Sequence, residues 1–272
     1  SGPSYSRCCL DTCPERRAVR RWLIAGTTAG AAGLVVADRA AKRRFGRPRR
    51  RPNRHEVPTG AADVSLTAVD GSTLRGWWLV SADGATGPAA LVIHGWGGSA
   101  ADMIPVADPL LRLGLHVLLL DARGHGRSDD VAVASMPSFA DDVRAGMRWL
   151  GTRPEVDPTG VVLVGHSVGA GACLYAASDD PDTAAVIALA SMADPRVFMR
   201  GQLQRVLPRP LATLALRYVE HTIGGRFEEF VPVATIAGIH APVLLLHGAQ
   251  DTTVPVADAY RLHALAPANT TL

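Results

Sequence analysis

Five short apolar runs, none of them with a regular alternation of polar residues, most constrain the fold of this 272-residue chain. A strand covered on one face alternates apolar and polar residues, whereas a strand covered on both faces is apolar throughout. Stretches with helical spacing, such as 138–150 and 168–177, separate the runs. We therefore predict an α/β fold with a mostly parallel, doubly wound sheet. The predicted buried strands are 89–93, 115–120, 161–164, 185–190 and 243–246.

An antiparallel hairpin is predicted before the parallel strands. Residues 64–69 and 73–80 are rich in apolar side chains, and Asp70-Gly71 joins them. Asp-Gly between two such runs is the strongest short-range signal for a β-hairpin. Further along, 195–241 interrupts the alternation of strands and helices with helical and loop character. An insertion between two buried strands predicts a helical lid over the carboxyl ends of the sheet.

Charge divides the chain near residue 54. Residues 1–54 contain 14 Arg and Lys residues against three acidic ones, although the whole chain carries only +3. The domain predicted at 55–272 is therefore acidic overall, behind a basic leader. An uncharged run, 22–37, lies between arginines in this leader. As a helix it would span about 24 Å, which is less than the hydrocarbon core of a typical bilayer.

Three interpretations of the run 22–37 stay open: a single-pass signal anchor, a cleaved signal, and a helix lying in the membrane interface. We favour the anchor, because a dense basic stretch follows where a cleavage site would lead into the mature protein. The basic residues after the run slightly favour a cytoplasmic domain under the positive-inside rule. Anionic lipid headgroups are the expected partner of the leader. Nucleic acid is not expected, because no aromatic platform accompanies the basic residues. The remaining alternative is a disordered basic tail.

The number and spacing of the cysteines predict neither a disulfide scaffold nor a metal site. Four cysteines are too few to staple a chain of this length. Cys8, Cys9 and Cys13 lie close together, but the first histidine of the chain is His55, so no fourth ligand is near them. We expect no metal and no cofactor. Cys173 is expected to be a small buried residue on a helix.

Gly165-His166-Ser167-Val168-Gly169 lies directly between a predicted strand and a predicted helix. A turn this sharp forces its central residue into a strained backbone conformation, and glycines two positions to either side avoid clashes. Ser167 would then present its hydroxyl as a nucleophile at the helix N-terminus. The Val168 amide would stabilise the oxyanion that forms when a carbonyl is attacked. The alternative is an ordinary glycine-rich turn.

Two upstream loops fit the same site. The segment 94–98, HGWGG, follows a predicted strand, so the Trp96 N–H is the expected second oxyanion donor. His94 is expected to brace this loop rather than to act as a base. The segment 121–129, DARGHGRSD, follows the next strand and predicts a tight hydrogen-bonded loop. We expect Arg123 and His125 to be structural there.

Asp251 lies just beyond the last of the predicted buried strands. A carboxylate at that place can reach an imidazole on a neighbouring loop, hold its tautomer and stabilise its charged form. Asp251 is therefore the candidate acid of a catalytic triad. The alternative is that it caps a turn or a helix.

The segments DGSTLRGWWL, HGWGGS, DARGHGRSD, GHSVG and HGAQDTTVP occur in this order. Over about 60–272 the chain thereby resembles the α/β-hydrolase superfamily, and within it the lysophospholipase and monoacylglycerol-lipase-like serine hydrolases. The resemblance implies that Ser167 is the nucleophile, Asp251 the acid, and the Trp96 and Val168 amides the oxyanion hole. It also implies an N-terminal membrane helix in many members. An Asp in place of Ser167 would have indicated a dehalogenase or an epoxide hydrolase.

The family places its catalytic histidine after one further helix and strand beyond the acid. Here the helix is predicted at 256–265 and the strand starts at 270–272, with no histidine after it. The other histidines fit less well: His263 lies within the helix and His247 precedes the acid, while His221 and His240, in the insertion or at its exit, stay open. We expect that the sequence is truncated at its C-terminus, with the last strand and helix missing, and that the base lies beyond Leu272.

These residues together predict a serine hydrolase that cleaves an ester or thioester bond of an apolar acyl substrate through an acyl-enzyme. The substrate would be a small molecule or a lipid. A serine peptidase of the same fold is an alternative, because the same residues hydrolyse amides. A catalytically silent member that binds a lipid or a partner is the alternative from another class.

Overall fold

The structure is a computed structural model that describes residues 38–39, 42, 46, 57–82 and 84–272. The chain divides into Ser1–Phe45 and Gly46–Leu272, and all elements described below belong to the second unit. The predicted membrane helix at 22–37 and most of the basic leader lie outside the described residues, so the anchor stays a prediction. Within the described ranges, no helix combines the length and the apolar character needed to cross a bilayer.

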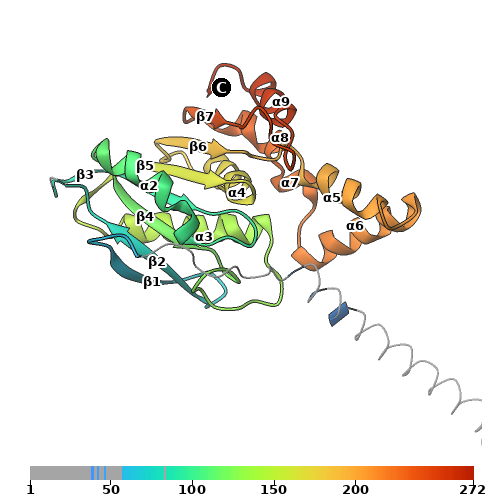
Figure 1. Cartoon of the computed structure of the whole chain (residues 1–272), viewed down its shortest axis with the longest axis horizontal. Coiled ribbons are helices and arrows are strands. Elements are labelled where there is room, and N and C mark those ends of the chain that lie inside the picture. The colour runs from blue at the N-terminus through green and yellow to red at the C-terminus, as the bar shows by residue number, and fades with distance from the viewer. Residues whose placement is uncertain (1–37, 40–41, 43–45, 47–56, 83) are drawn as a thin grey trace, which may run out of the picture. The chain divides into compact units, whose positions relative to one another are not determined.

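An eight-stranded sheet forms the centre of this unit, in the order β1-β2-β4-β3-β5-β6-β7-β8 (Figure 1). β1 and β2 are antiparallel and form the predicted hairpin, with Gly71 in its turn at φ 83°. β2 also runs antiparallel to β4, and all later pairs are parallel. The predicted sheet is therefore confirmed. Its strands are β1 Ala62–Thr67, β2 Thr73–Leu79, β3 Gly87–Ile93, β4 His116–Asp121, β5 Val156–His166, β6 Ala185–Leu189, β7 Val243–Leu246 and β8 Thr270–Thr271.

Helices cover both faces of the sheet. The short helix η2 Ala100–Met103 and α2 Ile104–Arg112 pack on one face, and α3 Met136–Leu150 and α4 Val168–Ser178 pack on the other. The sequence analysis did not predict α2. This helix has proline in its first turn and a second proline, Pro109, inside it. Proline in a helix interior usually marks a break, so the pattern was misleading here.

The central strands explain why their sequences lack polar alternation. In β3, Ala89 and Leu91 belong to the core under α3 and α4, whereas Ala90 and Val92 belong to the core under η2 and α2. β4 divides its residues in the same way, with Leu118 on one face and Leu119 on the other. The central positions of these strands therefore meet apolar side chains on both faces, and a polar residue would lose its hydration there. In β3 and β4, buried polar residues occur only at the two ends of β4, His116 and Asp121.

β6 and β7 are apolar on both faces but fully buried on only one. The face under α4 holds buried residues such as Val186 and Leu245. The face shared with α2 is covered less completely, and Leu246 at its edge is 44% exposed. The half-buried residues of that face are Ile187, Leu189 and Leu244.

The predicted insertion is helical. It contains α5 Pro195–Gln204, α6 Arg209–Ile223, α7 Phe227–Phe230, α8 Pro232–Thr235 and η3 Ile236–Gly238, and α9 Ala257–Leu265 follows β7. α5 and α6 pack against each other as a hairpin, whereas α8 and η3 pack against α4. In Figure 1 the α5–α6 hairpin stands out from the sheet. Its function as a lid stays a prediction.

The close approach of β2 and β4 gives a stability prediction. A Cβ at Gly76 would lie 2.5 Å from the Leu119 carbonyl oxygen, which belongs to the backbone of the neighbouring strand. Gly76→Ala should therefore lower the free energy of unfolding by about 1–3 kcal/mol, measured by urea denaturation. Gly201→Ala is the matched control, because a Cβ there meets no atom within 4 Å. Equal stabilities of the two variants would contradict the predicted clash.

Candidate active site

The order of the strands marks the place of the site. The chain passes from β3 to β4 on one side of β3 and then returns to β5 on its other side. In open parallel sheets, a crevice forms at the carboxyl ends of two strands that are related in this way, and ligands bind there. The loop 94–98 follows β3, and Ser167 follows β5. The two sequence-predicted segments therefore flank the point where the strand order reverses.

Ser167 has a strained backbone. Its φ of 54° and ψ of −114° lie in a region that side-chain-bearing residues rarely adopt. The turn is held from both sides: the Ser167 amide donates to the Leu189 carbonyl at 2.8 Å, and the Gly171 amide donates to the Ser167 carbonyl at 3.1 Å. Such strain costs on the order of 1–3 kcal/mol and persists only where surrounding contacts impose it.

The two glycines of the motif are required by backbone contacts. A Cβ at Gly165 would lie 2.3 Å from the Gly169 carbonyl oxygen, and a Cβ at Gly169 would lie 2.4 Å from the His94 carbonyl oxygen. Both contacts are with backbone, which cannot move aside as a flexible side chain can. α4 consequently starts in direct contact with the end of β3.

The loop after β3 packs on the turn that carries Ser167. A Cβ built at Gly95 would lie 3.2 Å from the Cβ of Ser167 and 2.9 Å from Nδ1 of His166. Val168 is the first residue of α4, so its amide has no acceptor within the helix. Trp96 is 39% exposed, and its ring lies 5.4 Å from that of His125. The structure thus brings together Ser167, Val168 and the loop that contains Trp96.

His94 is buried and fully hydrogen-bonded as a neutral imidazole. Its Nδ1 lies 2.7 Å from the Gly95 carbonyl oxygen, and its Nε2 accepts from the Ala122 amide at 3.1 Å. A proton on Nε2 would face that amide donor. Burial lowers the pKa of His94 to about 4. His94 therefore braces the loops after β3 and β4, as expected, and does not serve as a base.

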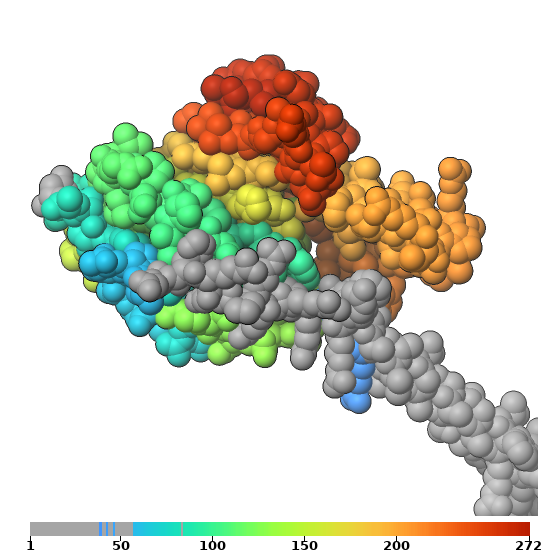
Figure 2. Space-filling model, in the orientation of Figure 1, coloured from blue at the N-terminus to red at the C-terminus, as the bar shows by residue number. Residues whose placement is uncertain are grey.

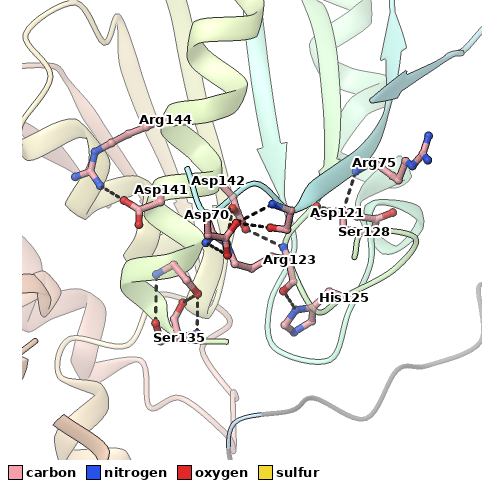
Figure 3. A network of polar contacts seen from close by, with 12 residues as sticks. Asp70, Arg75, Asp121, Arg123, His125, Ser128, Ser135, Asp141, Asp142 and Arg144 are labelled. Carbon is pink, nitrogen blue, oxygen red and sulfur yellow. Dashed lines mark hydrogen bonds and ion pairs between the residues drawn. The ribbon is translucent and has the colours of Figure 1, made fainter. Parts of the chain in front are cut away.

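Arg123 anchors the loop after β4 (Figure 3). Its amide and its Nε each donate to Asp142 at 2.8 Å, and a terminal nitrogen donates to Asp70 at 2.7 Å. Burial raises the pKa of Asp142 to about 6, although Arg123 opposes this shift. His125 Nδ1 donates to the Arg123 carbonyl at 3.0 Å. The sequence analysis missed Asp142; its place between Phe139 and Val143 on the apolar face of α3 was the available signal.

Asp121 links the loops at the carboxyl edge. It accepts a hydrogen bond from the Ala100 amide at 2.7 Å and from the Arg127 amide at 3.1 Å. Burial raises the pKa of Asp121, and these two amides and the Arg127 charge oppose the rise. Ser99 and Asp102 form a capping box at the start of η2. This capping box fixes the end of the loop that follows β3.

Asp251 lies in a tight turn after β7. Its Oδ1 accepts from the amides of Thr253 and Val254 at 2.7 and 2.9 Å, and these bonds lower the pKa of the carboxyl group. β7 is two strands from β5 in the sheet, which corresponds to about 10 Å. Asp251 therefore needs an intervening imidazole to act on Ser167. No hydrogen bond joins Ser167 Oγ or Asp251 to a histidine within the described residues.

The histidines considered for this role have other positions. His263 Nδ1 donates to Thr270 Oγ1 at 2.7 Å, at the start of β8 and thus at the opposite edge of the sheet. His240 precedes β7 at the same opposite edge, and His221 is exposed in the last turn of α6. His247 follows β7 but uses its Nε2 to donate to the Val254 carbonyl at 2.8 Å.

His166 is the histidine beside the nucleophile. It is exposed at the carboxyl edge of the sheet, next to Gly95. Partial desolvation lowers its pKa, and the negative charges of Asp251 and Asp102 oppose this effect. The sequence analysis assigned it no role.

Cys173 is buried in α4, and burial raises the pKa of its thiol. Among the described residues, no three His, Cys, Asp or Glu side chains gather as metal ligands do.

Comparisons with known proteins agree with this arrangement. A family model for the alpha/beta hydrolase fold matches 88–217. An uncharacterised protein of Mycobacterium tuberculosis (strain ATCC 25618 / H37Rv) is 32% identical over 217 residues, which is 79% of this chain and 70% of the relative. The chain belongs to the α/β-hydrolase family. The narrower lysophospholipase-like assignment stays a prediction.

Solved structures share the fold of this α/β-hydrolase-family protein. An esterase of Pyrococcus furiosus aligns with a TM-score of 0.63 at 24% identity, covering 83% of this chain and 86% of the esterase. Est1E of Butyrivibrio proteoclasticus, solved with ferulic acid, aligns with a TM-score of 0.64 at 22% identity, covering 77% of this chain and 87% of that one. These alignments confirm the predicted α/β-hydrolase fold.

The buried neutral His94 gives a pH prediction for this α/β-hydrolase-family protein. An unfolded histidine has a pKa near 6.5, whereas the folded value is about 4. As pH falls from about 6.5 to 4, the unfolded chain takes up a proton that the folded chain does not, so stability is lost by up to about 1.4 kcal/mol per pH unit. Urea denaturation at several pH values measures this slope. His94→Asn should flatten it by this amount, and an unchanged slope would show that His94 titrates normally.

Proposed function

We propose that this protein is a serine hydrolase that cleaves carboxylic ester or thioester bonds. Ser167 attacks the substrate carbonyl and forms an acyl-enzyme, while the Trp96 and Val168 amides bind the oxyanion. A histidine takes the Ser167 proton and returns it to the leaving group, and water then releases the acid. The observation that carries the proposal is the strained φ of 54° at Ser167, imposed beside the switch point of the sheet.

Two of the solved structures with a similar fold favour ester chemistry. One of them is an esterase, and another was solved with ferulic acid, a small aromatic acid. An apolar acyl group suits the surroundings of Ser167, where Val168 is half-buried and Trp96 is partly exposed. The substrate class we propose is therefore an ester or thioester with an apolar acyl part, on a small molecule or a lipid.

Asp251 is proposed as the acid that orients the base. Its Oδ1 is occupied by the Thr253 and Val254 amides, which leaves Oδ2 to accept from an imidazole. His247 Nε2 lies 3.9 Å from Oδ2, too far for a hydrogen bond, and already donates to the Val254 carbonyl. His247 therefore supports the turn of Asp251 rather than replacing the base.

We further propose that the base belongs to a segment after Leu272. His94, His247 and His263 are engaged in other hydrogen bonds, and His240 lies at the opposite edge. Among the described contacts, His166 and His221 make no hydrogen bond to Ser167 or Asp251. The half-covered face of β6 and β7, with Leu246 at its edge, is where a further helix of the same chain would pack.

The nucleophile is tested by replacing Ser167 in the longest natural form of the protein. Ser167→Ala should reduce hydrolysis of short p-nitrophenyl esters to background and abolish labelling by a fluorophosphonate probe, because no other hydroxyl sits at the turn. Ser178→Ala, at the other end of α4, is the matched control and should keep full activity. Ser167→Gly should be equally inactive but more stable, by about 1 kcal/mol or more, since it relieves the strained φ. Residual activity of more than a few per cent in Ser167→Ala would overturn the assignment of the nucleophile. If the unmodified protein is folded but the probe does not label it, the catalytically silent binding alternative is favoured instead.

The position of the base is tested separately. The 1–272 chain should turn over esters about 10⁶-fold more slowly than a form with its native continuation, because members of a triad act as a unit. The comparison uses one p-nitrophenyl ester and a Ser167→Ala background for each form. Ordinary turnover by the 1–272 chain, lost in His247→Ala or His166→Ala, would instead place the base among the described residues.

A further inference from the structure

The α5–α6 hairpin differs in charge from the rest of 55–272. Residues 195–223 contain five arginines and one acidic residue, Glu220, whereas the remainder of 55–272 contains nine arginines and 21 acidic residues. Within 55–272, this excess of positive charge therefore belongs to one protruding element. Figure 2 shows it as the orange part that stands out from the body of the unit.

Most of this positive charge is not neutralised by ion pairs. Arg196 pairs with Asp194 at 3.2 Å and also with Glu228. Arg205 donates to the side chain of Gln202, which is uncharged. Among the residues that the structure describes, no carboxylate pairs with the other four arginines of the hairpin, Arg200, Arg205, Arg209 and Arg217.

α6 has two apolar faces, and only one of them is packed. Ala212 and Leu216 are buried, in a spacing of four that faces α5 and the core. Leu211 and Leu214 lie on the other side of the helix and are 51% and 64% exposed. Val206, in the turn between the two helices, is 78% exposed. A helix that packed only against the protein would carry polar residues on its outer side.

We propose that this outer face of the hairpin docks on an anionic lipid surface. Exposed leucine and valine side chains would enter the boundary between headgroups and acyl chains, and the four unpaired arginines would meet lipid phosphates. Exposed apolar and cationic side chains on one helical element are characteristic of interfacial helices. An acidic protein partner would satisfy the arginines, but its charge would give no reason for the exposed leucines.

The proposal does not depend on catalysis, because among the described contacts no hydrogen bond or ion pair joins these residues to Ser167. It has one consequence if the proposed function is correct. α5 begins shortly after the carboxyl end of β6, the edge at which Ser167 lies. Docking through the hairpin would therefore hold this edge near the bilayer, and the substrate would be an ester that partitions into it.

The test is hydrogen–deuterium exchange of the full chain with vesicles, which locates binding along the sequence and so separates the hairpin from the basic leader. Vesicles of phosphatidylcholine with one third phosphatidylglycerol should slow exchange of amides in 195–223, and pure phosphatidylcholine should have little effect. Arg205→Glu/Arg209→Glu should require about tenfold more anionic lipid or more for the same protection, because each arginine near the surface contributes to binding. Leu211→Ser/Leu214→Ser should also lose protection.

Matched controls separate docking from general effects. Arg112→Glu/Arg261→Glu and Leu113→Ser/Leu265→Ser change exposed residues elsewhere and should keep the protection of the hairpin. Arg205→Lys/Arg209→Lys should restore it, and circular dichroism should show unchanged helix content in each variant. Unchanged exchange of 195–223 on anionic vesicles overturns the proposal. Equal protection by soluble polyglutamate, insensitive to the leucine variants, also overturns it and indicates an acidic protein partner.

Discussion

The contact between the first turn of α4 and the end of β3 is the constraint on which the rest of the site depends. Gly169 lies against the His94 carbonyl, and Gly165 lies against Gly169, with no room for a Cβ at either position. Because the helix starts so close to the sheet, the chain must reverse sharply at Ser167 and pays for it in an unfavourable φ. The loop after β3 is then pressed onto the same turn through Gly95. These three close contacts together position the candidate catalytic groups, which are the Ser167 hydroxyl and the Val168 and Trp96 amides.

Buried polar side chains hold the loops around Ser167 in place. Each of these side chains has hydrogen-bond partners that suit one of its protonation states. His94 stays neutral because it is buried, and its Nε2 accepts from the Ala122 amide. Asp142 is paired with Arg123 inside the protein, where the loss of either partner would leave a charge without compensation. Asp121 accepts from two backbone amides of different loops. These groups form hydrogen bonds to the backbone of the loops around Ser167 and thereby hold those loops in place.

The sequence predicted the parts of the fold that depend on local patterns. Continuous apolar runs predicted β3, β4, β6 and β7 to within about two residues, because buried strands leave no freedom for polar side chains. Asp70-Gly71 predicted the hairpin for a stereochemical reason. α2 was missed because it contains two prolines. Helix propensities count proline as a helix breaker, although proline is tolerated in the first turn of a helix. Asp142 was missed although it lies on the apolar face of α3, because its partner Arg123 is 19 residues away in sequence and no local pattern identifies that partner.

The tight backbone packing at the elbow also limits where this protein can change. Positions 165 and 169 admit only glycine, whereas the side chains of His166 and Val168, one residue away on either side of Ser167, are exposed and half-buried. A Cβ at position 165 or 169 would push α4 away from β3, whereas positions 166 and 168 already carry side chains. Within this turn, backbone packing fixes the two outer positions and leaves the two side chains beside Ser167 free to differ.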